Sequence, residues 1–342
     1  MASSAEQFAS SFNFGALSKA TDLKKRIWFT LAALVVYRLG TYIPIPGIDP
    51  AILKEIFEQN AGGILGMFDM FAGGALGRMT IFALNIMPYI SAAIIMQLMT
   101  AVSPNLETLK KEGEAGRKKI NQYTRYLTVL LAAVQAYGIS VGLENMASGG
   151  GAAVTNPGVF FKATTVITLV GGTVFLMWLG EQITARGIGN GISLIIFAGI
   201  VANLPQALAG TLELGRTGAL SAALIIILFI MAIAVIAFIV FIERSQRKIT
   251  VQYPKRQTGN KMTGGESSHL PLKLNVSGVI PPIFASSLLL MPVTLAQFSA
   301  SGGGPEWLTT INALLGRGQP LYLAVYIGLI VFFAFFYTAI VF

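Results

Sequence analysis

The chain has no cysteine and a single histidine, His269. Without a thiol it forms no disulfide and holds no thiolate-bound metal, and one histidine excludes a multi-histidine metal site. Charged residues are also scarce, at 11% of the sequence, whereas soluble domains carry about 25%. So little charge cannot cover a soluble surface. We therefore exclude a soluble enzyme or binding domain as the bulk of the chain, and the 54% of hydrophobic residues also excludes disorder.

Long apolar runs make up much of the sequence. A helix that crosses a bilayer needs about 17–25 mostly apolar residues. Eight runs meet this requirement, at 27–43, 79–102, 126–143, 163–179, 191–209, 218–242, 276–298 and 320–342. Arg38 is the one charged residue within them. The pattern predicts an all-α polytopic membrane protein with eight transmembrane helices, and we expect no cofactor.

The distribution of lysine and arginine predicts the orientation in the membrane. With the N-terminus inside, the inner segments are 1–26, 103–125, 180–190 and 243–275. They hold 18 of the 24 Lys and Arg residues, whereas Asp and Glu divide almost evenly, 8 of 15. Because basic residues accumulate in cytoplasmic loops, we predict a cytoplasmic N-terminus. The sequence stops at Phe342 within an apolar run, so we also expect it to be part of a longer chain.

Residues 62–78 are apolar but irregular, with six glycines and Asp69. Each glycine disfavours a helix by about 1 kcal/mol relative to alanine. A lipid-facing aspartate at the centre of a span would cost roughly 2.5–3.5 kcal/mol. A ninth transmembrane helix is therefore not expected here. The segment either folds back into a protein-lined cavity, where irregular backbone is tolerated, or rests on the outer surface as an interfacial half-helix.

Two of the predicted cytoplasmic segments are strongly basic. The first, 103–125, has six Lys and Arg residues and is typical of topology marking with anionic-lipid contact. The second, 243–275, has seven, and it contains β-prone text, ITVQY at 249–253, followed by PKRQTGNK. We predict a β-hairpin with a basic tip that suits an acidic partner such as RNA.

Motifs of catalysis and nucleotide binding are weak or absent from the sequence. GIGNG at 187–191 lacks the Lys-Ser/Thr continuation of a phosphate-binding loop, and we expect a tight turn between two spans. The chain contains no HExxH, no GxSxG and no paired intramembrane carboxylate. Nothing in the sequence therefore carries membrane-enzyme chemistry.

Several long segments of the sequence are distinctive. They are PIPGID at 44–49, MFDMFAGGALGRMTIFALNIMPYISAAIIMQL at 67–98, KKEGEAGRKKINQYTRY at 110–126, WLGEQITARGIGNGIS at 178–193, IFAGIVANLP at 196–205 and HLPLKLNVSGVIPPIFASS at 269–287. All of them resemble the SecY family, the channel subunits of the bacterial Sec protein translocon. The resemblance runs from about residue 20 to the end of the sequence, and its pattern is bacterial.

The resemblance implies an inverted-repeat bundle of ten transmembrane helices, of which eight are present here. Residues 1–26 form a cytoplasmic N-terminal segment. The first half, 27–209, is complete, and the second, 210–342, lacks two spans and the family's last large cytoplasmic loop, which lies between helices eight and nine. Residues 64–78 match the plug, a re-entrant element that seals the resting pore, which favours the cavity over the surface half-helix. Asn85 stands where glycine is common in the family.

The resemblance also assigns roles to individual residues. The apolar pore ring matches Ile86, Ile90, Ile196 and Ile283. Plug residues are Ile64, Leu65, Met67, Phe68, Asp69, Phe71 and Leu76. The lateral gate, through which hydrophobic segments reach lipid, matches spans 79–102 and 276–298, with Ser91, Gln97, Ser286 and Ser287. The loop that contacts the ribosome and SecA matches Arg244, Arg247, Lys248, Lys255 and Arg256.

The function implied is a passive protein-conducting channel in the bacterial plasma membrane. Its expected partners are SecE, SecG, the SecA motor, the ribosome, the secretory or nascent polypeptide with its signal sequence, and lipid. The alternative is a secondary transporter, which also uses inverted repeats. A transporter is expected to place Asp, Glu or His at the midplane for coupling, and the predicted spans contain none.

Overall fold

The structure is a computed structural model, and it describes most of the chain. The described residues are 21–49, 52–53, 69, 72–145, 147–148, 151–252, 256–258, 261–263, 267–278, 281–282, 284–286, 288–289 and 320–341. They divide between two compact units, one of residues 1–205 and 286–326, the other of 206–285 and 327–342.

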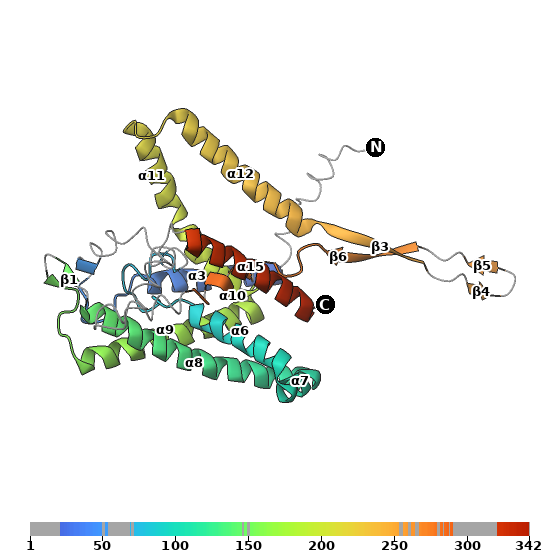
Figure 1. Cartoon of the computed structure of the whole chain (residues 1–342), viewed down its shortest axis with the longest axis horizontal. Coiled ribbons are helices and arrows are strands. Elements are labelled where there is room, and N and C mark those ends of the chain that lie inside the picture. The colour runs from blue at the N-terminus through green and yellow to red at the C-terminus, as the bar shows by residue number, and fades with distance from the viewer. Residues whose placement is uncertain are drawn as a thin grey trace. The chain divides into compact units, whose positions relative to one another are not determined.

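The first unit is a helical bundle (Figure 1). Its helices are α3 (Thr21–Gly40), α6 (Met87–Val102), α7 (Pro104–Lys111), α8 (Glu114–Asn145), α9 (Val159–Arg186) and α10 (Gly191–Ala202). A short hairpin of β1 (Ala147–Ser148) and β2 (Gly151–Ala152) lies between α8 and α9. Helix α9 is central, because α3, α8 and α10 all pack against it, and α6 packs on α8.

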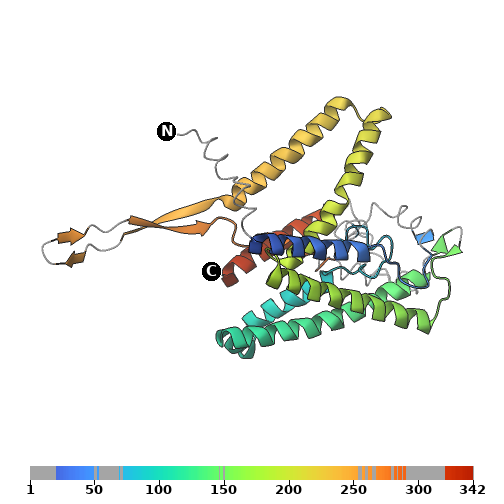
Figure 2. The same cartoon turned by 180° about the vertical axis from the view of Figure 1, so that it is seen from behind.

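The second unit contains α11 (Leu204–Arg216) from Gln206 onward, α12 (Ala222–Arg244) and a β-hairpin. In the hairpin β3 (Gln246–Gln252) pairs antiparallel with β6 (Ser267–Lys273), and β4 (Arg256–Thr258) pairs with β5 (Lys261–Thr263). Figure 2 shows the β3–β6 ribbon following α12, with the β4–β5 pair further out. Helix α15 (Pro320–Val341) begins in the first unit and continues into the second.

Five helices in the described part of the chain are long and apolar enough to cross a bilayer. They are Glu114–Glu144, Val159–Arg186, Gly191–Arg216, Ala222–Arg244 and Pro320–Ala339. A sixth span is reached if α6 and α7, which meet at a 97° bend, are counted as one. Helix α12 is the most apolar, with a mean hydropathy of 3.5 and no buried residue within the span. The chain is therefore a multi-pass α-helical membrane protein.

The predicted spans agree with the helices in most places and differ at 79–102. That helix begins only at Met87, because residues 72–86 form turns. Met79 and Asn85 have positive φ angles of 42° and 49°, which a right-handed helix does not allow. Pro88 lies in the first turn of α6, where proline is tolerated. Most of span 276–298 lies outside the described residues.

The predicted turn at 187–191 is confirmed, and it joins α9 to α10. Asn190 caps α10, since its Oδ1 accepts hydrogen bonds from the amides of Ile192 and Ser193 at 3.0 and 3.2 Å. The helices then approach closely, and a Cβ on Gly191 would lie 2.0 Å from the carbonyl oxygen of Gly180. Small residues permit such backbone contact between membrane helices. The predicted halves, 27–209 and 210–342, stay a prediction, because the two units follow contacts rather than repeat symmetry.

Candidate functional site

Residues 72–86, which we call the turn segment, include the end of the predicted plug, 72–78, and lead into α6. Main-chain bonds tie the segment to residues 43–45 just after α3: the amide of Ile45 donates to Met79 at 2.9 Å and the amide of Ile81 donates to Ile43 at 3.0 Å. Pro44 forms a β-bridge with Thr80. Buried backbone groups need such partners. The PIPGID text therefore supplies a docking strip for the turn segment.

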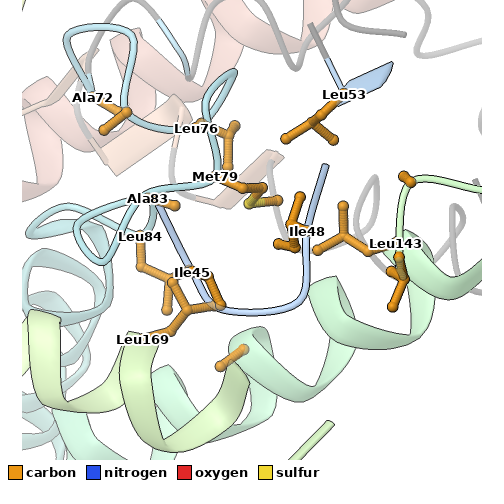
Figure 3. Close-up of a cluster of buried hydrophobic side chains, with 14 of the residues drawn as sticks. Ile45, Ile48, Leu53, Ala72, Leu76, Met79, Ala83, Leu84, Leu143 and Leu169 are labelled. Atoms are coloured by element: carbon orange, nitrogen blue, oxygen red, sulfur yellow. The ribbon is translucent and has the colours of Figure 1, made fainter. Parts of the chain in front are cut away.

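One face of the turn segment lies in an apolar cluster (Figure 3). Leu76, Met79 and Leu84 point toward Ile45 and Ile48 from the docking strip, and α8 and α9 close the cluster with Leu143 and Leu169. Ile45, Leu143 and Leu169 are at most 1% exposed. The irregular backbone is thus lined by protein, which is the condition under which membrane proteins tolerate it.

Of the predicted plug residues, Asp69 and Leu76 are described. Leu76 is 8% exposed and belongs to the apolar cluster. Asp69 organises a loop, since its Oδ1 accepts the amide of Gly77 at 2.6 Å and its carbonyl accepts the amide of Gly74 at 2.9 Å. Burial raises the pKa of the Asp69 carboxyl above its usual range, although bonds from Gly77 and Leu76 and the charge of Arg78 oppose the rise. Ile64, Leu65, Met67, Phe68 and Phe71 lie outside the described residues.

A second apolar cluster contains two of the predicted pore-ring residues. Ile86 is 1% exposed and precedes α6, and Ile90 follows one turn later and packs against the same cluster. Leu176 and Ile183 of α9 and Ile195 of α10 complete its interior. Ile196 is half-buried, one position beyond Ile195, and Ile283 lies outside the described residues. The convergence of all four isoleucines stays a prediction.

A row of aromatic rings crosses this cluster, and the sequence did not predict it. Tyr37 of α3 stacks on Phe82 with ring centroids 6.2 Å apart, and Phe82 stacks on Phe175 of α9 at 5.8 Å. Trp178 continues the row at 5.8 Å from Phe175. Gly40 makes room for it, because a Cβ there would lie 1.9 Å from the Phe82 ring. In the sequence, Gly40 and Gly172 were the available signal of close packing, but a glycine does not identify the aromatic ring that packs against it.

The predicted lateral-gate residues are found in different environments. Ser91 is half-buried and Gln97 exposed on α6, whereas Ser286 is 5% exposed. Ser287 lies outside the described residues. Whether these side chains line one gate stays a prediction.

The basic loop forms the hairpin that the sequence predicted, and its first strand, β3, begins three residues before the β-prone text at 249–253. Arg244, Arg247 and Lys248 are all exposed. Neighbouring residues on a strand face opposite sides, so Arg247 and Lys248 present charge on both faces of the ribbon. Lys255 lies outside the described residues, and Arg256 is described in its backbone only, as the start of β4.

Comparison with known proteins supports the same architecture. Residues 80–342 match the SecY family model. Protein translocase subunit SecY of Rickettsia bellii is 58% identical over 323 residues, which is 94% of this chain and 74% of the relative. The Escherichia coli K12 protein of that name is 56% identical over 321 residues, 94% of this chain and 72% of the relative.

Solved structures share the fold at lower identity. A protein-conducting channel superposes with a TM-score of 0.57 at 20% identity, and Sec61 of a canine ribosome–channel complex with 0.56 at 20%. A SecY structure superposes with 0.53 at 21%, and its plug domain is described as stabilising the closed state and maintaining a membrane seal. This chain spans about 60% of those chains, and 82% of it is covered.

The helical bundle, the buried irregular segment and the apolar cluster define a multi-pass membrane protein with the fold of a protein-conducting channel. At the identity and coverage just given, the particular family is plain. The chain belongs to the SecY family.

Proposed function

We propose that this chain is the channel subunit of a bacterial protein translocase, a passive conduit for unfolded polypeptides that also releases hydrophobic segments sideways into lipid. The observation that carries the proposal is 58% identity to a protein translocase subunit over 94% of the chain. The protein is not an enzyme in this proposal. Work is supplied by partners, a SecA ATPase or a translating ribosome.

The apolar cluster around Ile86 suits this task physically. An apolar constriction sheds water and closes by dewetting, which limits ion leak. It also offers no charged group that would hold one type of passing side chain. In the proposal Ile86, Ile90, Ile196 and Ile283 form that constriction, and Ser91, Gln97, Ser286 and Ser287 line the lateral gate.

Serine substitutions test the constriction. Ile86→Ser combined with Ile196→Ser is expected to raise the ion conductance of the resting channel in planar bilayers, since polar side chains favour wetting. Ile167→Ser is the matched control, because Ile167 is 72% exposed on α9. An unchanged conductance in the double variant would contradict the pore-ring assignment.

We also propose that residues 64–78 act as the plug. Support comes from the protein-lined position of Leu76 and from the seal attributed to the plug domain of the SecY structure above. Deleting 64–78 is expected to raise resting conductance, and the increase is transient in each channel if neighbouring loop residues take the place of the plug. A deletion channel that leaks no more than the parent throughout the recording would refute the plug.

The hairpin is proposed as the docking element for the ribosome or SecA. Support comes from its exposed basic side chains and from the Sec61 channel, which is described in a complex with a ribosome. Contacts between basic side chains and RNA phosphates weaken with salt because counterions are released. Replacing Arg247, Lys248, Lys255 and Arg256 with Glu should weaken ribosome or SecA binding and flatten its salt dependence. The proposal further includes SecE and SecG partners, a plasma-membrane location and a cytoplasmic N-terminus.

A further inference from the structure

Arg38 is the one charged residue in the predicted spans, and its position needs an explanation. It lies in the last turn of α3 and is half-buried. Charged side chains inside membrane segments are costly and usually face protein partners with a functional purpose. The proposed channel mechanism assigns no role to Arg38.

The structure gives the Arg38 guanidinium two hydrogen-bond partners. Nη1 donates to the carbonyl oxygen of Gly73 at 2.8 Å, and Nη2 donates to the hydroxyl of Tyr42 at 3.2 Å. The Tyr42 ring also lies under two cations, with the Cζ atoms of Arg38 and Arg78 at 5.1 and 4.6 Å from its centroid. The first bond links α3 to a loop 35 residues further along the chain.

Gly73 also lies close to α10. It is buried with a φ of +67°, and a Cβ there would lie 3.0 Å from both Cα and O of Gly199 on α10. Within the loop, Asp69 accepts the amides of Gly74 and Gly77, so the loop keeps its own shape. Its position therefore rests on the apolar packing of Leu76, on the contact with Gly199 and on the bond from Arg38.

We propose that Arg38 is a positioning residue that latches the loop of residues 72–78 against α3 and α10 through the Gly73 carbonyl. A charge-assisted hydrogen bond is about twice as strong as a neutral one, and it is also readily broken if water enters. The latch holds the loop in the docked state and releases it as a unit. This inference rests on the proposed function, because docking regulates the channel only if the loop is part of the seal.

Cysteine accessibility tests the latch directly, because the chain has no native cysteine. Ala75 is fully buried in the docked loop, and Ala132 of α8 is fully buried in the same apolar cluster. Labelling of an Ala75→Cys chain by an impermeant maleimide, in intact membrane complexes, reports undocking. Labelling of an Ala132→Cys chain reports general loosening of the bundle.

In the Ala75→Cys background, Arg38→Met is expected to speed labelling about tenfold to a hundredfold, the range for losing a hydrogen bond to a charged group. Arg38→Lys keeps a charged donor and should restore part of the protection. Arg216→Met is the matched control, since Arg216 pairs with Glu213 on its own helix. Unchanged labelling at position 75, or an equal rise at position 132, would overturn the latch.

Resting conductance of the same variants separates the latch from the proposed function. Increases in both labelling and conductance for Arg38→Met support the latch and the seal together. Faster labelling of Arg38→Met without an increase in resting conductance supports the latch but refutes the loop as a seal. In that case, deletion of 64–78 should also leave the resting conductance unchanged. A leak without faster labelling refutes the latch, because Arg38 would then act elsewhere.

Discussion

Two adjacent glycines of α9 allow a controlled test of the packing around the turn segment. A Cβ on Gly172 would lie 2.0 Å from the carbonyl oxygen of Ile81 and 3.3 Å from the ring of Phe82. Real Cβ atoms essentially never approach within 3.0 Å, so the backbone at Ile81 must move to accept alanine. A Cβ on Gly171 meets nothing within 4 Å.

The expected magnitudes follow from these two environments. Alanine is favoured over glycine in a helix by about 1 kcal/mol, and both substitutions gain this term. Overpacking a close contact costs about 1–3 kcal/mol, and only Gly172→Ala incurs that cost. We therefore expect Gly171→Ala to be neutral or slightly stabilising. Gly172→Ala should be less stable than Gly171→Ala by about 1–3 kcal/mol.

The free energy of unfolding, measured for both purified variants in the same detergent, checks the difference. The displaced backbone at Ile81 lies five residues before Ile86, so Gly172→Ala should also alter resting conductance while Gly171→Ala does not. Stabilities that agree within about 0.5 kcal/mol, the usual scatter of surface substitutions, would refute the close approach of α9 to the turn segment.

Three further outcomes are expected. A cysteine at Gln257 should be labelled by an impermeant reagent from the cytoplasmic side only, and labelling from outside would overturn the topology. Asn85→Gly should be tolerated because glycine accepts the +49° φ, whereas Asn85→Ala should lower the free energy of unfolding by about 1 kcal/mol; equal stabilities would contradict the strained backbone. Asn190→Ala should lower the free energy of unfolding by about 1 kcal/mol through loss of the α10 cap, measured by the same assay. An unchanged free energy would show that the cap does not stabilise α10.

Much of the fold was predictable because local sequence patterns identify membrane helices and strands. The spans at 126–143 and 163–179 lie within α8 and α9, the span at 218–242 coincides with α12 apart from its first four residues, and the basic loop pairs as a hairpin. Within lipid, a single long apolar segment satisfies its own backbone hydrogen bonds by forming a helix. The turn at 187–191 followed from its glycine-rich text between two apolar runs.

The start of α6 was not predictable, because it depends on contacts distant in sequence. Met79 reads as an ordinary helix former, yet its φ is +42° and its carbonyl accepts the amide of Ile45. Tertiary packing overrides local preference here. The Arg38 bond to Gly73 was hidden for the same reason: the sequence marks the charge as unusual but does not identify a partner 35 residues away.

In the β3–β6 ribbon, main-chain pairing constrains the sequence more than side-chain packing does. Its described side chains are almost all exposed, including the cross-strand pair Ile249 and Leu270 at 44% and 52%. Two-stranded ribbons are marginally stable alone in water, and main-chain pairing makes few demands on side-chain identity. Substitutions on the ribbon are therefore expected to have little effect on the stability of the helical bundle. Under the docking role proposed above, the hairpin is the place where such a chain could adapt to a new ribosome or motor without changes to its pore.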